Sequence, residues 1–290
     1  MNDLFISSDN EQANGYKEHQ EQLAKNAGNI LKKDDDWYYN DKMYLTNTHM
    51  GKLLSGGPKH LQAYYQGNQK ETQALIFGRA QHCLLFEPEM FESRFYAIDD
   101  TEICEEIGGK VPRATKKYKE WKAEILERNT HRQELSIEDM TDIRNMIEVA
   151  LSIPQVKELI ESAKMREVIY EKTIKGVKCK CKVDAINSPH FILDYKSTRH
   201  PATLFNWSRI ERERRYNRQA SFYRDITGAR SFWWILQEKT YPYTVALIEQ
   251  SEDSYQQGVE EYELAIDKFK KFFINGNADD LKNYFEMGML

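Results

Sequence analysis

Two aspartates and a lysine have the spacing of a site that hydrolyses phosphodiesters. Nine residues separate Asp184 from Asp194, and Lys196 follows two positions later. Carboxylate oxygens are the ligands that hard divalent cations prefer, so the two acids could hold a metal ion. Such a metal would lower the pKa of a water molecule and neutralise charge in the transition state, while the lysine ammonium could hold the attacking water. Short matches of this kind also occur as solvated salt bridges at strand ends, so further signals are needed.

The surrounding residues predict a β-hairpin. Three consecutive segments read as an alternating strand, a turn and an extended apolar strand: residues 178–186, 187–190 and 191–195. A turn centred near Ser188 makes Asp184 and Asp194 close to cross-strand partners, so that their carboxylates converge. Strand periodicity places Lys196 on the same face as Asp194. The hairpin therefore predicts a shared site for all three side chains.

Two predicted helices carry polar residues that could reach this site. His82 lies one turn after Gly78, where the absence of a side chain could let the helix approach another backbone closely and leave the imidazole facing the site. Gln219 and Tyr223 are four positions apart and hence share a helical face, where they could contact a phosphate or hold Lys196. The structural alternatives stay open: His82 as a core histidine, and the other pair as part of a stripe that packs on the sheet.

The ordered combination of these motifs resembles the PD-(D/E)XK nuclease superfamily, in particular its RecB-like and exodeoxyribonuclease VIII (RecE)-like phage exonuclease branch. In that branch a Gly-x-x-x-His helix precedes the sheet and a Gln-x-x-x-Tyr motif follows the catalytic lysine. The resemblance extends from about Tyr44 to about Gln250. One departure is Val183, which precedes Asp184 where the superfamily usually has proline.

The resemblance implies a role for each matched residue. The implied metal ligands are His82, Asp184, Asp194 and the carbonyl oxygen of Tyr195. The implied catalytic residues are Asp184, Asp194, Lys196, Gln219 and Tyr223. A further acid, Glu171 on the preceding strand candidate, is a candidate for an additional metal-contacting carboxylate. The implied cofactor is Mg²⁺, for which Mn²⁺ can substitute.

Cysteine usage and hydropathy indicate the compartment. The four cysteines form no C-x-x-C pair, and none follows Cys181, whereas the iron–sulfur cluster of some RecB-like nucleases has ligands after the catalytic lysine. We therefore expect no iron–sulfur cluster. No stretch approaches the roughly 20 apolar residues of a membrane span, and the first residues lack a secretory signal pattern. We expect no membrane association and a cytoplasmic location, which the resemblance places in a phage-infected or prophage-bearing bacterial host.

The charge distribution limits the mode of DNA binding. A net charge of −5 argues against a protein that coats DNA nonspecifically. Residues 110–122 nevertheless contain six basic residues interleaved with Tyr118 and Trp121, which predicts either a DNA-backbone track or a solvated helix whose aromatic side chains face the core. A second, mixed-charge cluster precedes Gln219. The candidate DNA contacts are Arg113, Lys116, Lys117, Arg215 and Arg218.

The predicted fold is α/β (mixed α+β), with a central mixed β-sheet flanked by helices. The resemblance implies a restriction-endonuclease-like core with a helical N-terminal elaboration. We expect a polar peripheral arm over residues 1–43 and one nuclease domain over 44–290. Within that domain, the helical region, the sheet core and the C-terminal helix are expected at residues 44–165, 166–250 and 251–276. Residues 99–117 are expected to be an irregular loop near the substrate path.

The function expected from these observations is a metal-dependent DNA exonuclease. The resemblance implies 5′ to 3′ degradation of linear duplex DNA from its ends, leaving 3′ single strands for a phage-type annealing protein, and a ring-shaped homo-oligomer. Two alternatives are a RecB- or Cas4-like nuclease acting on single strands or flaps, and a noncatalytic DNA-binding or assembly module of the same fold.

Overall fold

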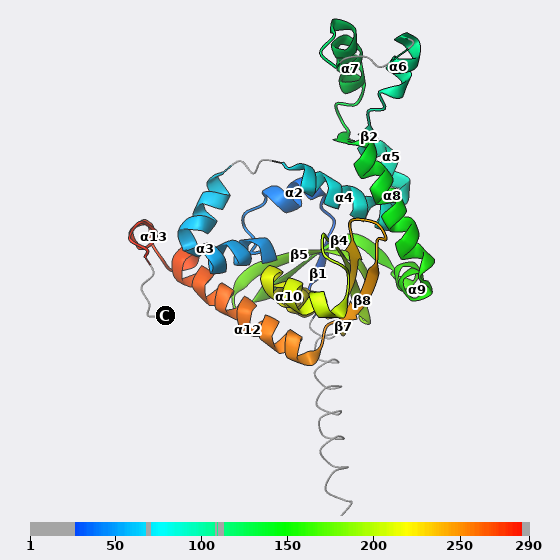
Figure 1. Ribbon diagram of the computed structural model, residues 1–290. Coiled ribbons are helices and arrows are strands. Elements are labelled where there is room, and N and C mark those ends of the chain that lie inside the picture. The colour runs from blue at the N-terminus through cyan, green and yellow to red at the C-terminus, as the bar shows by residue number, and fades with distance from the viewer. Residues whose placement is uncertain (1–26, 68–70, 108, 110–112, 286–290) are drawn as a thin grey trace, which may run out of the picture.

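A mixed β-sheet lies at the centre of the molecule (Figure 1). The computed structural model describes residues 27–67, 71–107, 109 and 113–285. Six strands of these residues form the sheet in the order β1-β4-β5-β6-β7-β8, and all neighbours are antiparallel except the parallel pair β6–β7. The strands are β1 (Asn29–Leu31), β4 (Met165–Ile174), β5 (Val177–Asn187), β6 (Phe191–Thr198), β7 (Ser231–Glu238) and β8 (Val245–Glu249). The predicted fold class is confirmed.

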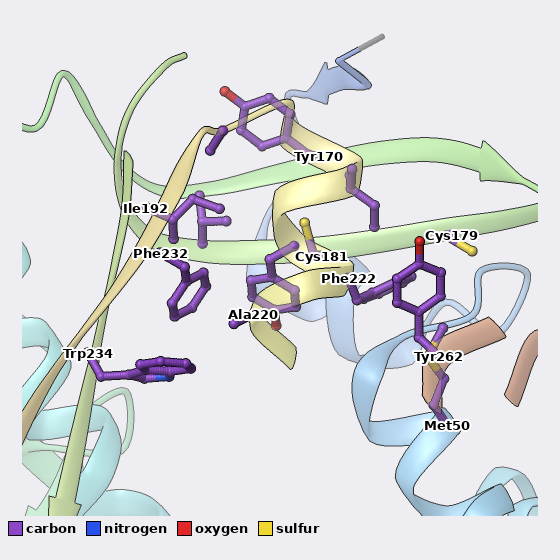
Figure 2. Close-up of a cluster of buried hydrophobic side chains, with 14 of the residues drawn as sticks. Met50, Tyr170, Cys179, Cys181, Ile192, Ala220, Phe222, Phe232, Trp234 and Tyr262 are labelled. Atoms are coloured by element: carbon purple, nitrogen blue, oxygen red, sulfur yellow. The ribbon is translucent and has the colours of Figure 1, made fainter. Parts of the chain in front are cut away.

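One face of the sheet is covered by helices from both ends of the chain. These helices are α3 (Asn47–Gln66), α10 (Leu204–Arg214), α11 (Tyr216–Thr227) and α12 (Glu252–Phe269). Figure 2 shows Phe222 of α11 beside Tyr262 of α12, and Phe232 and Trp234 of β7 in the same cluster. The side chains of Phe222, Phe232 and Trp234 are completely buried. Each such side chain contributes about 1.5–3 kcal/mol through removal of apolar surface from water. The β5 residues Cys179 and Cys181 lie in the same cluster, so these thiols serve as small apolar core groups.

A second layer covers the opposite face. It consists of α4 (Gln73–Phe86), α8 (Ile137–Ser152) and α9 (Pro154–Ser162). Leu193 and Tyr195 of β6 point into this layer, whereas Ile192 lies in the first cluster, as strand alternation requires. Pro154 begins α9 one residue after the end of α8, at a position where its fixed φ and missing N–H suit a helix start. The sheet is therefore enclosed between two apolar clusters.

Two helices carry the mixed-charge cluster and Gln219. Arg215 adopts a left-handed conformation with φ 54°, which ends α10 and begins α11. The second helix then runs against α12, where Gly258 lies so close to Asn217 that a Cβ atom would overlap its carbonyl oxygen. After α12 the chain continues through the π-turn η2 (Lys270–Ile274) to the short α13 (Ala278–Lys282).

An arm projects from the layer that contains α4 and α8 (Figure 1). The turn η1 (Pro88–Met90) and α5 (Phe91–Arg94) lead to its base, a parallel pair of β2 (Phe95–Ala97) and β3 (Gln133–Leu135). The arm itself carries α6 (Thr101–Ile107) and α7 (Lys116–Arg128). Residues 99–117 are therefore partly helical rather than an irregular loop, while 108 and 110–112 lie outside the described residues.

The position of Tyr118 distinguishes between the two interpretations of residues 110–122, a DNA-backbone track or a helix whose aromatic side chains face the core. Its side chain is 7% exposed and its hydroxyl donates to the Asp100 carboxylate over 2.7 Å. The ring also packs on Trp121, with centroids 5.5 Å apart. The aromatic side chains of this segment thus form the core of the arm, and the basic residues occupy its surface.

The described part of the N-terminal region differs from a peripheral arm. β1 pairs with β4 as an edge strand, and α2 (Asp35–Asn40) is anchored by a lysine of β5. Lys180 is completely buried, with its ammonium 4.2 Å from the centroid of Trp37 and 3.1 Å from the carbonyl oxygen of Asp41. Cation–π contact and hydrogen bonding compensate the desolvation of this charge, which fixes α2 on the sheet. Residues 1–26 lie outside the described part. No helix among the described residues has the length and apolar character needed to cross a membrane.

Candidate active site

A cavity of about 750 Å³ lies where β5 and β6 separate. Its wall contains residues of α2, α4, β4, β5, β6 and α11, together with the base of the arm. Six of the side chains singled out in the sequence line it: His82, Asp184, Asp194, Lys196, Gln219 and Tyr223. The fold therefore gathers residues from four elements, and more than a hundred positions separate His82 of α4 from the other five residues.

The register of the hairpin explains why the two aspartates meet. The antiparallel ladder between β5 and β6 ends at the pair Ala185–Leu193, and Asp184 and Asp194 are the next residue on each strand. Beyond this pair the Asp184 carboxylate accepts the backbone amide of Tyr195 over 3.0 Å. A side chain thus satisfies an amide at the point where the strands separate. The separation opens the space into which both carboxylates can reach.

Asp184 forms an ion pair with His82 of α4. The distance from Nδ1 of His82 to Oδ2 of Asp184 is 3.1 Å, and the imidazole packs edge-on against the ring of Tyr195. Burial alone would lower the pKa of His82, but the charge and hydrogen bond of Asp184 raise it. Burial would likewise raise the pKa of Asp184, but the imidazole outweighs it and the pKa is lowered. The pair therefore favours an imidazolium beside a carboxylate.

Asp194 is held from two sides. Lys196 places its ammonium 2.6 Å from Oδ2, and Gln219 donates from Nε2 to Oδ1 over 3.0 Å. Burial raises the pKa of Asp194 to about 6. The ammonium of Lys196 acts in the opposite direction, but repulsion from the Asp184 carboxylate partly offsets that effect. For Lys196, burial lowers the pKa, but the Asp194 carboxylate outweighs it and the net pKa is raised. Lys196 is therefore cationic at neutral pH.

Tyr223 lies deeper in the same wall. It is 8% exposed and lines the cavity together with Tyr38 of α2. The side chain of Tyr195, by contrast, points away from the aspartates, and its hydroxyl donates to Gln237 over 2.7 Å. Tyr195 is thus a core side chain whose backbone lies at the site.

One acid at the site was missed in the sequence. Glu167 of β4 occupies the position opposite Asp184, between the pairs Arg166–Ala185 and Val168–Val183. It has a left-handed φ of 51°, and it lines the cavity. The signal that could have identified it is the register of β4 against β5.

Glu171, the acid that was considered on β4, is elsewhere. Its carboxylate accepts the Tyr44 hydroxyl over 2.5 Å, and it lies opposite Asn29 of β1. It is not among the side chains that line the cavity. In the structure Glu171 therefore connects the N-terminal segment to the sheet.

The donor atoms present suit a hard divalent cation. Possible ligand atoms of His82, Glu167 and Asp184 all lie within 4.8 Å of one another. One carboxylate oxygen of Glu167, Oε1, is buried and has no hydrogen-bond partner among the described residues. Two carboxylates and one imidazole are a donor set for Mn²⁺ or Mg²⁺, with Asp194 on the adjacent strand. The residues thus fit the cation that the fold implies.

Gly78 has a different role from the one expected. A Cβ atom built at Gly78 would meet no atom within 4 Å, so the helix makes no close backbone approach there. Gly78 instead lines the cavity one turn before His82. The missing side chain therefore leaves space in the pocket.

The candidate DNA contacts lie in two places, neither inside the cavity. Arg113 and Lys116 are on the arm with side chains 79% and 90% exposed, and Lys117 is exposed beside them. Arg215 pairs with Glu261 at 2.9 Å. Arg218 is only 5% exposed and donates to Asn47 over 2.9 Å, so its guanidinium is occupied within the protein.

Comparisons with known proteins give one family and one fold. Residues 49–278 match the family described as a PDDEXK-like domain of unknown function (DUF3799). The structure is similar to the crystal structure of a protein from Eubacterium rectale described as "Putative exonuclease", with a TM-score of 0.59 and 14% sequence identity. The similarity covers 90% of this chain and 97% of that one. No curated protein sequence matches the chain.

Proposed function

The chain belongs to the DUF3799 family of PDDEXK-like domains, which confirms the predicted superfamily, and from this premise we propose that it is a metal-dependent deoxyribonuclease. The observation that carries the proposal is the convergence of Asp184, Asp194 and Lys196 with His82 in one cavity. A purely structural salt bridge would not require two acids, a lysine and a histidine from three elements around open space.

The residues divide the chemistry among them. His82, Glu167, Asp184 and Asp194 hold the divalent cation, and the carbonyl of Tyr195 is a further candidate ligand. The cation, Mg²⁺ or Mn²⁺, supplies charge neutralisation at the phosphate and makes a water molecule more acidic. Lys196, fixed by Asp194, orients the attacking water. Gln219 keeps the Asp194 carboxylate in place through its 3.0 Å hydrogen bond, and Tyr223 closes the wall behind it.

We further propose that the substrate is the end of linear duplex DNA, degraded from 5′ to 3′ to leave 3′ single strands for phage-type recombination with an annealing protein. This rests on the resemblance to exodeoxyribonuclease VIII-like enzymes and on the description of the Eubacterium rectale neighbour as an exonuclease. The same resemblance favours a ring-shaped homo-oligomer, which light scattering coupled to size-exclusion chromatography would test by the mass of the particle.

Digestion of end-labelled DNA tests the proposed function. Linear duplex, circular duplex and single-stranded DNA are incubated with Mg²⁺, Mn²⁺ or EDTA, using wild type, Asp194→Ala and Lys196→Ala. We expect metal-dependent loss of linear duplex alone, reduced by each variant about 10²-fold or more. Lys178→Ala, an exposed lysine on β5, is the control that should leave the rate unchanged.

The position of the label gives the polarity of degradation. Cleavage of single strands or flaps in preference to duplex ends would favour the RecB- or Cas4-like alternative. DNA binding without cleavage in either metal would contradict catalysis and favour the noncatalytic module.

A further inference from the structure

A second lysine of the cavity has no part in the mechanism above. Lys182 of β5 lies two residues before Asp184, so both side chains are on the same face of the strand. It lines the cavity, and its side chain is 13% exposed. The other two lysines of this strand segment are different: Lys178 is exposed, and Lys180 is enclosed by aromatic rings.

Lys182 is shared by two carboxylates. Its Nζ atom is 2.7 Å from Oε2 of Glu167 and 2.5 Å from Oδ1 of Asp35. Glu167 belongs to the group of potential cation ligands with His82. Asp35 belongs to the first turn of α2, and its side chain is 57% exposed. One partner of the lysine is thus a candidate cation ligand, and the other is a solvent-accessible group at the cavity wall.

Lys182 and Lys196 differ in the solvent exposure of the aspartates with which they pair. The partner of Lys196 is Asp194, whose side chain is 3% exposed and fixed by Gln219. Within the described part of the chain no second hydrogen bond of this kind holds the Asp35 carboxylate, which can turn to solvent at little cost because it keeps hydration there. A phosphodiester group carries one negative charge, as a carboxylate does, and so replaces it without changing the net charge around the ammonium.

We propose that Lys182 binds a phosphate group of the DNA backbone, and that the Asp35 carboxylate occupies this phosphate position when DNA is absent. The inference rests on the proposed function and extends it by assigning a substrate contact. A cation at the unpartnered Oε1 of Glu167 shares the charge of that carboxylate with Lys182, which stays paired to Oε2, so the ammonium is less well neutralised, and this is unfavourable for a buried charge. The incoming phosphate supplies the missing charge, so cation and DNA strengthen each other's binding.

DNA affinity in the presence and absence of a cation tests this assignment. Fluorescence anisotropy of a labelled duplex is measured with Ca²⁺ in place of Mg²⁺, or with EDTA, and a gel verifies that the DNA stays intact. We expect Lys182→Gln to weaken binding with Ca²⁺ roughly tenfold or more, as for loss of a charged hydrogen bond, and Lys182→Arg to retain most of the affinity. Calorimetry with Mn²⁺ alone checks that Lys182→Gln still binds the cation.

A pair of neighbouring acids provides a matched comparison. Asp35→Asn and Asp36→Asn remove the same charge from the same wall of the cavity, but Asp36 accepts from Asn40 and does not touch Lys182. Without a cation, Asp35→Asn should tighten DNA binding about fivefold more than Asp36→Asn does. In the Lys182→Gln background, the difference between the two should vanish.

The outcomes separate this inference from the proposed function. Wild type that binds DNA, with Lys182→Gln binding equally well, would overturn the role of Lys182 and leave the nuclease proposal intact. Equal effects of Asp35→Asn and Asp36→Asn on DNA binding would also overturn the role of Lys182. This comparison remains available if Lys182→Gln does not fold. Wild type that binds no DNA with either addition would overturn the proposed function and this inference with it.

Discussion

Asp184 and Asp194 are identical side chains in opposite electrostatic surroundings. Burial acts on both, yet the imidazole of His82 leaves the pKa of Asp184 lowered, whereas the pKa of Asp194 is raised to about 6. Two acids that face one cavity repel each other when both are ionised, so one of them retains a proton more readily. A cation that neutralises both removes this conflict.

The raised pKa of Asp194 predicts how metal binding depends on pH. Below about pH 6 the Asp194 carboxyl is protonated, and a cation must displace that proton. The apparent Mn²⁺ affinity should therefore fall as the pH decreases, first because the cation must displace a proton from His82, whose pKa is raised, and more steeply, by roughly tenfold or more per pH unit, below about pH 6. Titration calorimetry between about pH 5 and pH 8 measures this, with circular dichroism to verify the fold at each pH. An affinity that stays flat across the range would contradict the ligand role of Asp194.

The local chemistry of the site could be predicted from the sequence because it lies on one hairpin. Asp184, Asp194 and Lys196 are separated by short distances along the chain, so strand periodicity and one turn bring them together. Glu167 and Lys182 could not be identified in this way. Their positions depend on how β4 pairs with β5 and on where α2 lies, and neither is encoded in local patterning.

At the level of elements, two helical glycines differ in the space around them, and substitution by alanine should affect stability in opposite directions. Gly78 faces the cavity with nothing within 4 Å of a Cβ position, whereas a Cβ at Gly258 would overlap Asn217 and Ser221 of α11. We expect Gly78→Ala to stabilise the fold by about 0.5–1 kcal/mol through helix propensity, and Gly258→Ala to destabilise it by about 1–3 kcal/mol. Urea denaturation measures both.

A larger side chain at the first glycine tests the cavity itself. Gly78→Leu should fold as stably as wild type but lose DNA cleavage, because the side chain fills space next to His82. Full activity in this variant would show that substrate does not enter along α4.

The sequence pattern failed to predict elements whose position depends on residues far away in the chain. Residues 1–43 are polar and include Asp34, Asp35 and Asp36, which predicts a loose segment, yet the rings of Trp37 and Tyr38 in α2 hold the ammonium of Lys180 and so fix the helix. Helices with a regular apolar stripe, such as α12, were predicted close to their observed bounds. Position in the fold, rather than composition, decided the outcome for α2.

At the scale of the whole molecule, the arm projects from a protein of net charge −5, and its helix α7 carries several exposed basic side chains. Lys116 and Lys119 are exposed on α7, outside the cavity. We expect Lys116→Gln/Lys119→Gln to weaken binding of long duplex DNA and to reduce the slope of log affinity against log salt by about 1–2. Cleavage of a short oligonucleotide confined to the cavity should be unchanged.

The matched control for the arm is a lysine on another surface. Lys157→Gln on α9 removes one exposed charge and should leave the salt slope as in wild type. An equal loss in the control would mean that only net charge matters, and that the arm makes no contact with DNA.

The cavity wall includes residues from Asp35 in α2 to Tyr223 in α11, so it is complete only after both helices have been synthesised. Chains fold as they emerge from the ribosome, N-terminal parts first. A nascent chain that ends before α11 lacks Gln219 and the helix that covers one face of the sheet, so it has no finished pocket. We therefore expect the proposed nuclease activity to appear only after synthesis of the chain has passed α11.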